Sequence, residues 1–511
     1  MALRLKVPTD TPLSAAVMLS LAKSRYTLAS QFAFLATNAL GLLLATIYNA
    51  RTPDLYPNNA HHKLGWVVTW VVSAQALVSL VGWVAGAVSD QRSRGSTERL
   101  AFIPVYSDPA DGGCRMSNDS GHGTEPNTES LRSNSVSTLD DDEGLPMPSP
   151  RKDEYHRGDQ DDDRFDDMPL SSPAPASPLA SKAATVVSSS VWKYLDLLCR
   201  VVDRVILPLG FVALTTGIIT FGRFFEGDGI FSGLAHWVKG GVFFWLGLFT
   251  LGRWSGSFGE LGWAWNMRPR MKQHKWRPTA EFVESALIFF YGSTNIFLEH
   301  LGNWGREWSA QDLEHMAITV LFIGGGLCGM LIESTRIRDL LNAAVADVVA
   351  EDAFSDEERQ QQKPPATYEF SMNPIPALVI LLLGVMMGSH HQSTMISSMV
   401  HKQWGNLLLG ASFTRCLTYV LVFVRPPKSV LPSRPPTELL VSFGLIAGGI
   451  IFMASSSDTI TGMVHYDLDA MFVYTITMGL VGTLMAWEVV VLAIKGWATR
   501  KERRGAARAF P

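Results

Sequence analysis

Histidine and acidic residues recur in this chain beside long apolar segments, and their chemistry sets the first expectations about function. Imidazole and carboxylate groups together build the common protein sites for zinc, copper and iron. Inside a membrane the same groups form proton relays and ion pathways. We therefore predict a site for a metal ion or for protons, built from Glu299, His300, Asp312, Glu314, His315, His390, His391 and His401.

The segment HHQSTMISSMVH, residues 390–401, contributes most strongly to this prediction. On a continuous helix, His390, Ser397 and His401 would share one face, which would also carry Ser393 and Thr394. A polar stripe of this kind is expected to face the interior of a helical bundle. Hydrogen bonds between helices explain the same stripe, so a purely structural role stays open.

One arginine, Arg415, stands among apolar residues in the run 404–424. Its guanidinium is always charged, and a charge surrounded by hydrocarbon needs an anionic or carbonyl partner. We expect that partner to be Glu281, Glu284 or Glu333, which lie at the ends of two neighbouring apolar segments. A structural ion pair is favoured over a role in transport.

The elements that position these residues are apolar runs of about the length that crosses a bilayer. There are ten: 29–48, 63–88, 201–220, 234–252, 281–299, 315–333, 375–396, 404–424, 438–454 and 470–494. No soluble core can hide ten such runs, and a membrane barrel would alternate polar with apolar residues. The sequence predicts an all-α, polytopic integral membrane helical bundle with about 10 transmembrane helices. Its expected partner is the lipid bilayer, and no nucleic acid is expected.

Lysine and arginine divide unequally between the two sides of this bundle. They gather in the connections near residues 23–25, 92–99, 253–277, 336–338 and 425–434 and in the tail 500–504, and they are sparse in the others. We call the first set the basic side and the other the opposite side. Because basic loops remain cytoplasmic, both termini are predicted to be cytoplasmic, in the plasma membrane or an endomembrane.

The composition divides the chain into four parts. We predict an N-terminal membrane hairpin domain over 1–88, a disordered cytoplasmic loop over 89–190, an eight-span C-terminal membrane domain over 191–495 and a basic cytoplasmic tail over 496–511. The loop is rich in Ser, Pro, Asp and Gly and cannot bury enough apolar surface to fold. Protein partners of that loop are expected but unknown. The short apolar stretch 12–22 is interpreted as part of a helix whose start is missing, or as a signal-peptide core.

Several long strings of this sequence resemble one fungal family. They include QFAFLATNALGLLLATIYNARTPDLYPNNAHHKLGWV, GLAHWVKGGVFFWLGLFTLGRW, FLEHLGNWGREWSAQDLEH and FIGGGLCGMLIESTRIRDLLN. They resemble the Ytp-one-like family of polytopic membrane proteins, which pairs an N-terminal domain of unknown function with a longer C-terminal block. The resemblance implies a multi-pass fungal membrane protein and implies no particular reaction.

The N-terminal part is in turn similar to the di-haem transmembrane cytochromes, in which histidines on four helices form two pairs of haem ligands. His62 and His236 match two of those four positions. The run 29–48 contains no histidine, so neither residue has its expected partner, and haem is not expected. The segment GSHHQS also resembles animal membrane proteins of the transmembrane protein 45 family.

Four functions are compatible with these patterns. The first is a transport-associated membrane protein, not an enzyme, that binds protons or a transition metal such as zinc at the histidine and acid cluster. The second is a structural membrane protein without a site, and the third is a haem-dependent electron carrier. The fourth is a zinc-dependent lipid hydrolase using His315, His391 and Glu314, since such enzymes combine protein ligands with an acid acting as base. We favour the first.

Overall fold

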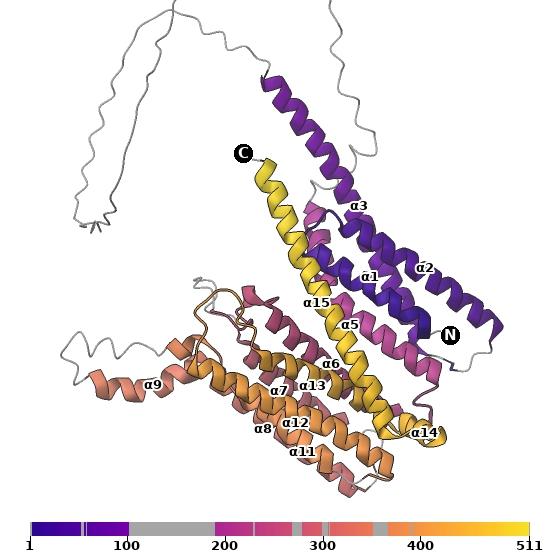
Figure 1. Ribbon diagram of the computed structural model, residues 1–511, viewed down its shortest axis with the longest axis vertical. Helices are drawn as coiled ribbons and strands as arrows, with labels where there is room; N and C mark the ends of the chain where they lie inside the picture. The colour runs from indigo at the N-terminus through magenta and orange to yellow at the C-terminus, as the bar shows by residue number, and fades with distance from the viewer. Residues whose placement is uncertain are drawn as a thin grey trace, which may run out of the picture. The chain divides into compact units, whose positions relative to one another are not determined.

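The computed structural model describes residues 3–52, 56–57, 59–101, 190–227, 230–267, 278–298, 305, 307–350, 366–389 and 392–509. Its regular structure over these ranges is helical throughout (Figure 1), which confirms the all-α prediction. The helices are α1 (Leu3–Leu21), α2 (Thr27–Arg51), α3 (Ala60–Ala101), α5 (Ser190–Gly222), α6 (Ile230–Ser255), α7 (Ala280–Leu298), α8 (Ala310–Glu333), α9 (Thr335–Ala350), α11 (Ile375–Ser389), α12 (Met395–Val424), α13 (Pro436–Ala454), α14 (Ser457–His465) and α15 (Ala470–Ala509), with short 3-10 turns at Gly259–Leu261 and Ala366–Glu369. Most of the predicted loop 89–190 lies outside the described residues.

Eight of the helices in these ranges are long and apolar enough to cross a membrane: α2, α3, α5, α6, α8, α12, α13 and α15. They correspond to eight of the ten predicted runs. The other two runs coincide with α7, which carries Glu281 and Glu284, and with α11, which has only 15 residues. A polytopic helical membrane protein is therefore established, and the count of ten stays a prediction.

The prediction of one apolar helix over 375–396, continued through His401, is wrong. Helix α11 ends at Ser389, and α12 begins only at Met395. The side chain of Thr394 accepts a hydrogen bond from the backbone amide of Ser397 (3.1 Å) and so caps the start of α12. Such capping satisfies an otherwise free amide and starts a new helix. Ser397 and His401 do share a face of α12.

Helix α6 approaches α13, and α11 approaches α12, so closely that their backbones touch. A Cβ built on Gly240 of α6 would lie 2.6 Å from the carbonyl oxygen of Gly449 in α13, and a Cβ on Gly449 would lie equally close to that of Gly240. Gly384 of α11 and Gly405 of α12 form a second contact of this kind, at 2.6 and 2.7 Å. Small residues at such crossings allow the close packing that holds membrane helices together.

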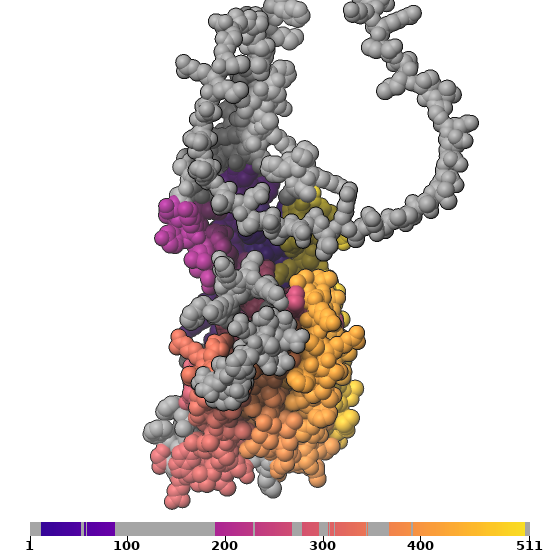
Figure 2. Space-filling model, turned by 90° about the vertical axis from the view of Figure 1, so that its left-hand side faces the viewer, coloured from indigo at the N-terminus to yellow at the C-terminus, as the bar shows by residue number. Residues whose placement is uncertain are grey.

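The outer surface of the described helices carries exposed apolar side chains. On α8 the residues Leu313, Val320, Leu327 and Leu331 are exposed and recur along one helix face. Figure 2 shows one side of the molecule, where the salmon segment near residue 320 and the orange segments after residue 375 form a continuous surface. Exposed apolar stripes over a packed bundle are the signature of a lipid-facing surface, so the chain is embedded in a bilayer.

Helices α1, α2 and α5 and the part of α3 up to Gly82 form a smaller N-terminal bundle. Its core contains Leu13, Val17, Phe34, Val68, Val72 and Ile206. Beside this core the buried carboxylate of Asp203 accepts hydrogen bonds from Ser20 Oγ (2.6 Å) and Gln75 Nε2 (2.5 Å). A polar group inside an apolar bundle is tolerated when such donors satisfy it. The predicted apolar stretch 12–22 belongs to α1, which packs in this core through Leu13 and Val17 and bonds to Asp203 through Ser20.

Contacts between connections are consistent with the predicted sides. Lys501 near the end of α15 donates to the hydroxyl of Tyr26 (2.6 Å), and Glu502 accepts from the amide of Arg25 (3.2 Å). These residues all belong to the basic side. Elsewhere the hydroxyl of Tyr56 donates to the carbonyl of Phe224 (2.9 Å), which joins two connections of the opposite side.

Replacing Gln75 by Leu should lower the free energy of unfolding by about 1–3 kcal/mol, because one oxygen of the buried Asp203 carboxylate loses its donor. The measurement is the unfolding midpoint of the purified chain in a fixed detergent. Thr483→Val is the matched control, since Thr483 is exposed on α15 and bonds only to the carbonyl of Gly479 in its own helix. Equal midpoints for both variants would show that the hydrogen bond between Gln75 and Asp203 adds nothing to stability.

Candidate functional site

Five buried ionisable residues meet near the basic-side ends of four helices. Arg253 lies in the last turn of α6, Glu281 and Glu284 in the first two turns of α7, and Glu438 in the first turn of α13. Arg415 comes from α12, and all five side chains are buried. Acids at helix starts and a base at a helix end complement the helix dipoles, so the local sequence favours these positions. We call these five residues the ion network.

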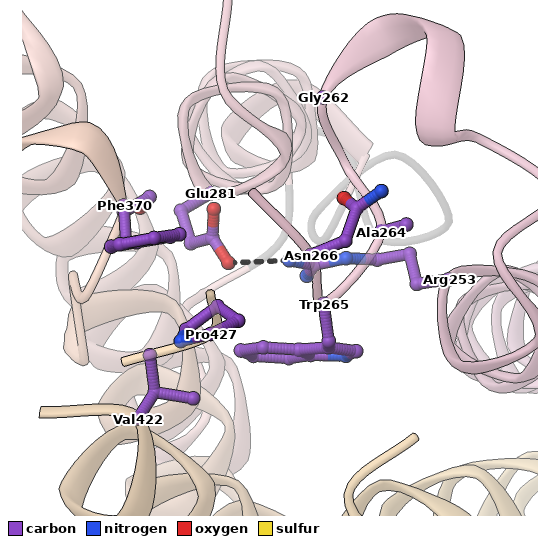
Figure 3. Close-up of a pocket in the computed structure, with 10 residues that line it drawn as sticks. Arg253, Gly262, Ala264, Trp265, Asn266, Glu281, Phe370, Val422 and Pro427 are labelled. Carbon is purple, nitrogen blue, oxygen red and sulfur yellow. Dashed lines mark hydrogen bonds and ion pairs between the residues drawn. The ribbon is translucent and has the colours of Figure 1, made fainter. Parts of the chain in front are cut away.

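The carboxyl group of Glu284 lies between the two arginines. Its Oε1 is 3.4 Å from Nη1 of Arg253 and 3.6 Å from Nη1 of Arg415. The remaining acids each contact one arginine: Glu281 Oε1 lies 2.8 Å from Arg253 Nη2 (Figure 3), and Glu438 Oε1 lies 2.9 Å from Arg415 Nε. The network is therefore a chain of alternating charge in which Glu284 has the two longest contacts.

Neutral and aromatic groups hold the arginines in place. Arg253 Nε donates to the carbonyl of Trp263 (2.8 Å), and Arg415 Nη2 donates to Thr250 Oγ1 (3.0 Å). The guanidinium carbon of Arg253 lies 4.7 Å from the ring centroid of Trp265, and that of Arg415 lies 5.8 Å from it. Cation–π contacts of this kind gain strength away from water. The hydroxyl of Tyr419 donates to Glu281 (3.4 Å).

Within the described part of the chain, the network sets three carboxyl groups against two guanidinium groups. Neither oxygen of Glu438 accepts a hydrogen bond from a described residue, because its 2.9 Å approach to Arg415 has the distance but not the angle of one. If all five groups were ionised, the network would carry one uncompensated negative charge in a low-dielectric interior. Burial disfavours such a charge, which a proton, a cation or the positive ends of the α7 and α13 helix dipoles could balance.

Two hollows flank the network. One is bordered by Arg253, Glu281 and Trp265 and by the connecting residues Asn266, Phe370, Ser371 and Pro427. Figure 3 shows the Arg253–Glu281 pair beside it, above the ring of Trp265. The other is lined by Glu284 and Arg415 among apolar residues of α6, α11, α12 and α13. The first hollow lies beside connections of the basic side, and the second lies beside Glu284.

The metal or proton site predicted from eight residues is not assembled in the described part of the chain. Glu299, His300, His390 and His391 lie outside it. Asp312 instead caps α8, accepting a hydrogen bond from the amide of Ser309 (3.0 Å), while Glu314 is exposed and His315 is half-buried. No group of three or more His, Cys, Asp or Glu among the described residues is arranged to hold a metal. That site stays a prediction.

The remaining predicted residues are placed as follows. His62 is exposed at the start of α3, where its backbone amide donates to Asn59 Oδ1 (3.2 Å). His236 packs against the buried His401, with 6.1 Å between the ring centroids. Arg415 contacts Glu284, one of its three predicted partners. Glu333, another of the three, accepts hydrogen bonds from Thr279 (2.6 Å) and Ser371 (2.7 Å).

Sequence reasoning did not assign Arg253, Trp265, Tyr419 or Glu438 to the site. Arg253 reads as one of many basic residues at a membrane edge, and Glu438 follows two prolines at the start of an apolar run. One signal was present: the acids and the arginine lie at helix ends that the charge asymmetry assigns to the same side. That placement brings them together, although it does not specify the pairs.

Comparisons with known proteins identify relatives over the whole chain. The protein-family model described as "Protein YTP1-like, C-terminal" matches residues 209–496. The family model of a domain of unknown function, DUF2427, matches residues 12–85. An uncharacterized membrane protein of Schizosaccharomyces pombe, C3B8.06, is 32% identical over 502 residues, which cover 96% of this chain and 92% of that protein.

Two proteins of Saccharomyces cerevisiae match over shorter regions. The uncharacterized membrane protein YCR061W is 40% identical over 57% of this chain and 47% of its own length. Protein YTP1 is 24% identical over 35% of this chain and 31% of its own length. No solved structure matches the chain.

Proposed function

This chain belongs to the YTP1-like family of membrane proteins, and on that premise we propose that it is a transport-associated protein whose C-terminal membrane domain takes up and releases a proton at the ion network. The observation that supports this most directly is the excess of one carboxyl group over the guanidinium groups. A network with matched charges would need no exchangeable ion.

A proton accounts for the balance better than a metal cation. Glu284, the central acid, already lies between two fixed guanidinium charges, which repel any further cation. Protonation of a carboxyl group needs no coordination shell and little space. Buried acidic side chains inside membrane bundles serve as proton relays elsewhere for the same reason.

Glu284 is the acid best placed to exchange the proton. Its contacts with Arg253 and Arg415 are the longest of the network, at 3.4 and 3.6 Å, so neither arginine is held as closely by Glu284 as by Glu281 or Glu438. It also lines the second hollow, whereas Glu438 is fully buried. A proton on Glu284 would weaken both arginine contacts and loosen α7 from α6 and α12. Such a change is the kind of two-state element that a transporter requires.

The test is proton flux into vesicles that contain the reconstituted full chain and a pH-sensitive dye, driven by a potassium diffusion potential. Glu284→Gln keeps the size of the side chain and removes its exchangeable proton, so we expect the flux to fall to that of protein-free vesicles. Glu260→Gln is the control, because Glu260 is exposed in the connection after α6. Equal flux for Glu284→Gln and the unmodified chain would reject the proposal.

The structural alternative makes a different prediction for the same preparation. If the network only packs helices, the unmodified chain and protein-free vesicles should show the same flux. The infrared carbonyl-stretch band of a protonated carboxyl group should then also be absent at neutral pH. A band that is present in the unmodified chain and lost in Glu284→Gln would support proton binding independently of flux.

A further inference from the structure

We propose that the imidazoles of His236 and His401 together bind a transition-metal ion, copper or zinc, near the opposite-side ends of α6 and α12. His236 lies about two turns into α6 and His401 about two turns into α12. The ion network lies toward the other end of the same helices, so the two sites are distinct.

In each of the two histidine rings, one nitrogen makes a hydrogen bond within its own helix and the other can act as a metal ligand. His236 Nδ1 lies 2.8 Å from the backbone carbonyl of Ser232, and His401 Nδ1 lies 2.8 Å from that of Ser397. A carbonyl oxygen only accepts hydrogen bonds, so each Nδ1 must carry the hydrogen. In a neutral imidazole this leaves the lone pair on Nε2. Histidines that bind metals are oriented in this way, with the second ring nitrogen donating to a carbonyl or carboxylate.

The separation of the two rings suits a shared ion. Their centroids are 6.1 Å apart and their planes are inclined at 89°. Bonds of about 2.0–2.1 Å from a metal to each Nε2 place the centres of two imidazoles roughly 5–6 Å apart. The separation of the centroids is therefore compatible with both rings binding one ion.

The surroundings of the pair are aromatic. Beneath the histidines the rings of Trp404 and Phe452 stack at 4.1 Å, and the His236 ring meets Phe452 edge-on at 5.7 Å. His401 also contacts Trp404, and its side chain is 4% exposed. An apolar shell of this kind controls how much solvent reaches a bound ion and lowers the local dielectric.

The ligand set decides which metals fit. Since no three His, Cys, Asp or Glu among the described residues are arranged to hold a metal, the protein supplies two nitrogen ligands and water completes the coordination. Copper(II) binds such nitrogen sites more tightly than the other divalent ions of its row, and zinc follows it. The half-buried His315 lies close enough to His236 to interact with it electrostatically.

The test uses copper(II) added to the purified full chain after treatment with a chelator. Electron paramagnetic resonance should show one bound ion per chain with hyperfine coupling to two nitrogens. His236→Asn and His401→Asn should each weaken binding by at least about tenfold. Asparagine places an N–H close to the position of Nδ1 and so preserves the bond to the carbonyl four residues earlier, while it lacks the Nε2 ligand.

His62→Asn and His465→Asn are the controls, because both histidines are exposed. They should leave affinity and spectrum unchanged. If all four variants bind copper as the unmodified chain does, the ion is adventitious and the proposal is rejected. The absence of nitrogen-coupled copper from the unmodified chain would reject it as well. Should His401→Asn fail to fold, the less buried His236 decides the question alone.

Discussion

Replacing Arg415 by Met should destabilise the chain by about 3–5 kcal/mol, the usual effect of removing one partner from a buried ion pair. Arg415 is the guanidinium that contacts Glu438, and it is one of two that contact Glu284. Without it the network would hold three carboxyl groups and only Arg253. Their mutual repulsion and desolvation would either unfold the site or force protonation of two acids.

A double variant separates the loss of charge balance from the loss of packing. In Arg415→Met combined with Glu438→Gln, the charge that Arg415 compensated is removed together with it. We expect this double variant to recover most of the lost stability, because replacing both members of a buried pair costs far less than replacing one. The measurement is the unfolding midpoint in detergent, together with the yield of monodisperse protein. If the double variant is no more stable than Arg415→Met, the ion pair is not the cause.

Replacing Gly449 by Leu should disrupt the packing of α13 on α6, with a cost of about 3 kcal/mol or more, at the upper end for overpacked sites. Even the first atom of the new side chain would lie 2.6 Å from the carbonyl oxygen of Gly240 and 2.6 Å from the amide nitrogen of Phe244. Both neighbours are backbone atoms of α6, so neither can turn aside as a flexible side chain would. The helices would have to separate.

Gly410→Leu provides the matched control for that substitution. Gly410 lies in α12, and a Cβ built on it meets nothing within 4 Å. Both variants add the same side chain to a helical glycine, so the difference between them isolates the crossing. We expect Gly410→Leu to retain the unfolding midpoint and elution profile of the unmodified chain. Similar losses in both variants would mean that the contact between α6 and α13 is not critical.

The fold could be predicted largely from the sequence because its main determinant is local. An apolar run of suitable length specifies a membrane helix whatever its neighbours are. The prediction failed where a short polar segment competes with helix continuation. Between Ser389 and Met395 the sequence favours a cap at Thr394 over an uninterrupted helix. Apolar content alone does not reveal such a break.

The candidate site could be predicted only in part because its pairing is tertiary. A lone arginine in an apolar run signals the need for an acid, and this signal gave three candidates, of which Glu284 contacts Arg415. Glu438 and Arg253 carry no such signal, since charges at helix ends are ordinary near a membrane surface. His236 and His401 lie far apart in the sequence, and only the crossing of their helices brings the rings together.

Helix α15 has a consequence for the order in which the protein is made. Its Trp487 donates to Ser14 of α1 (3.2 Å), and its Lys501 and Glu502 bind the connection between α1 and α2. A ribosome releases α1 long before α15. These bonds therefore form only after the intervening helices have been inserted. Until then the surface of α1 that later contacts α15 must be covered by lipid or by an insertion factor. Biogenesis of the N-terminal bundle is accordingly completed late, by a helix from the distant end of the sequence.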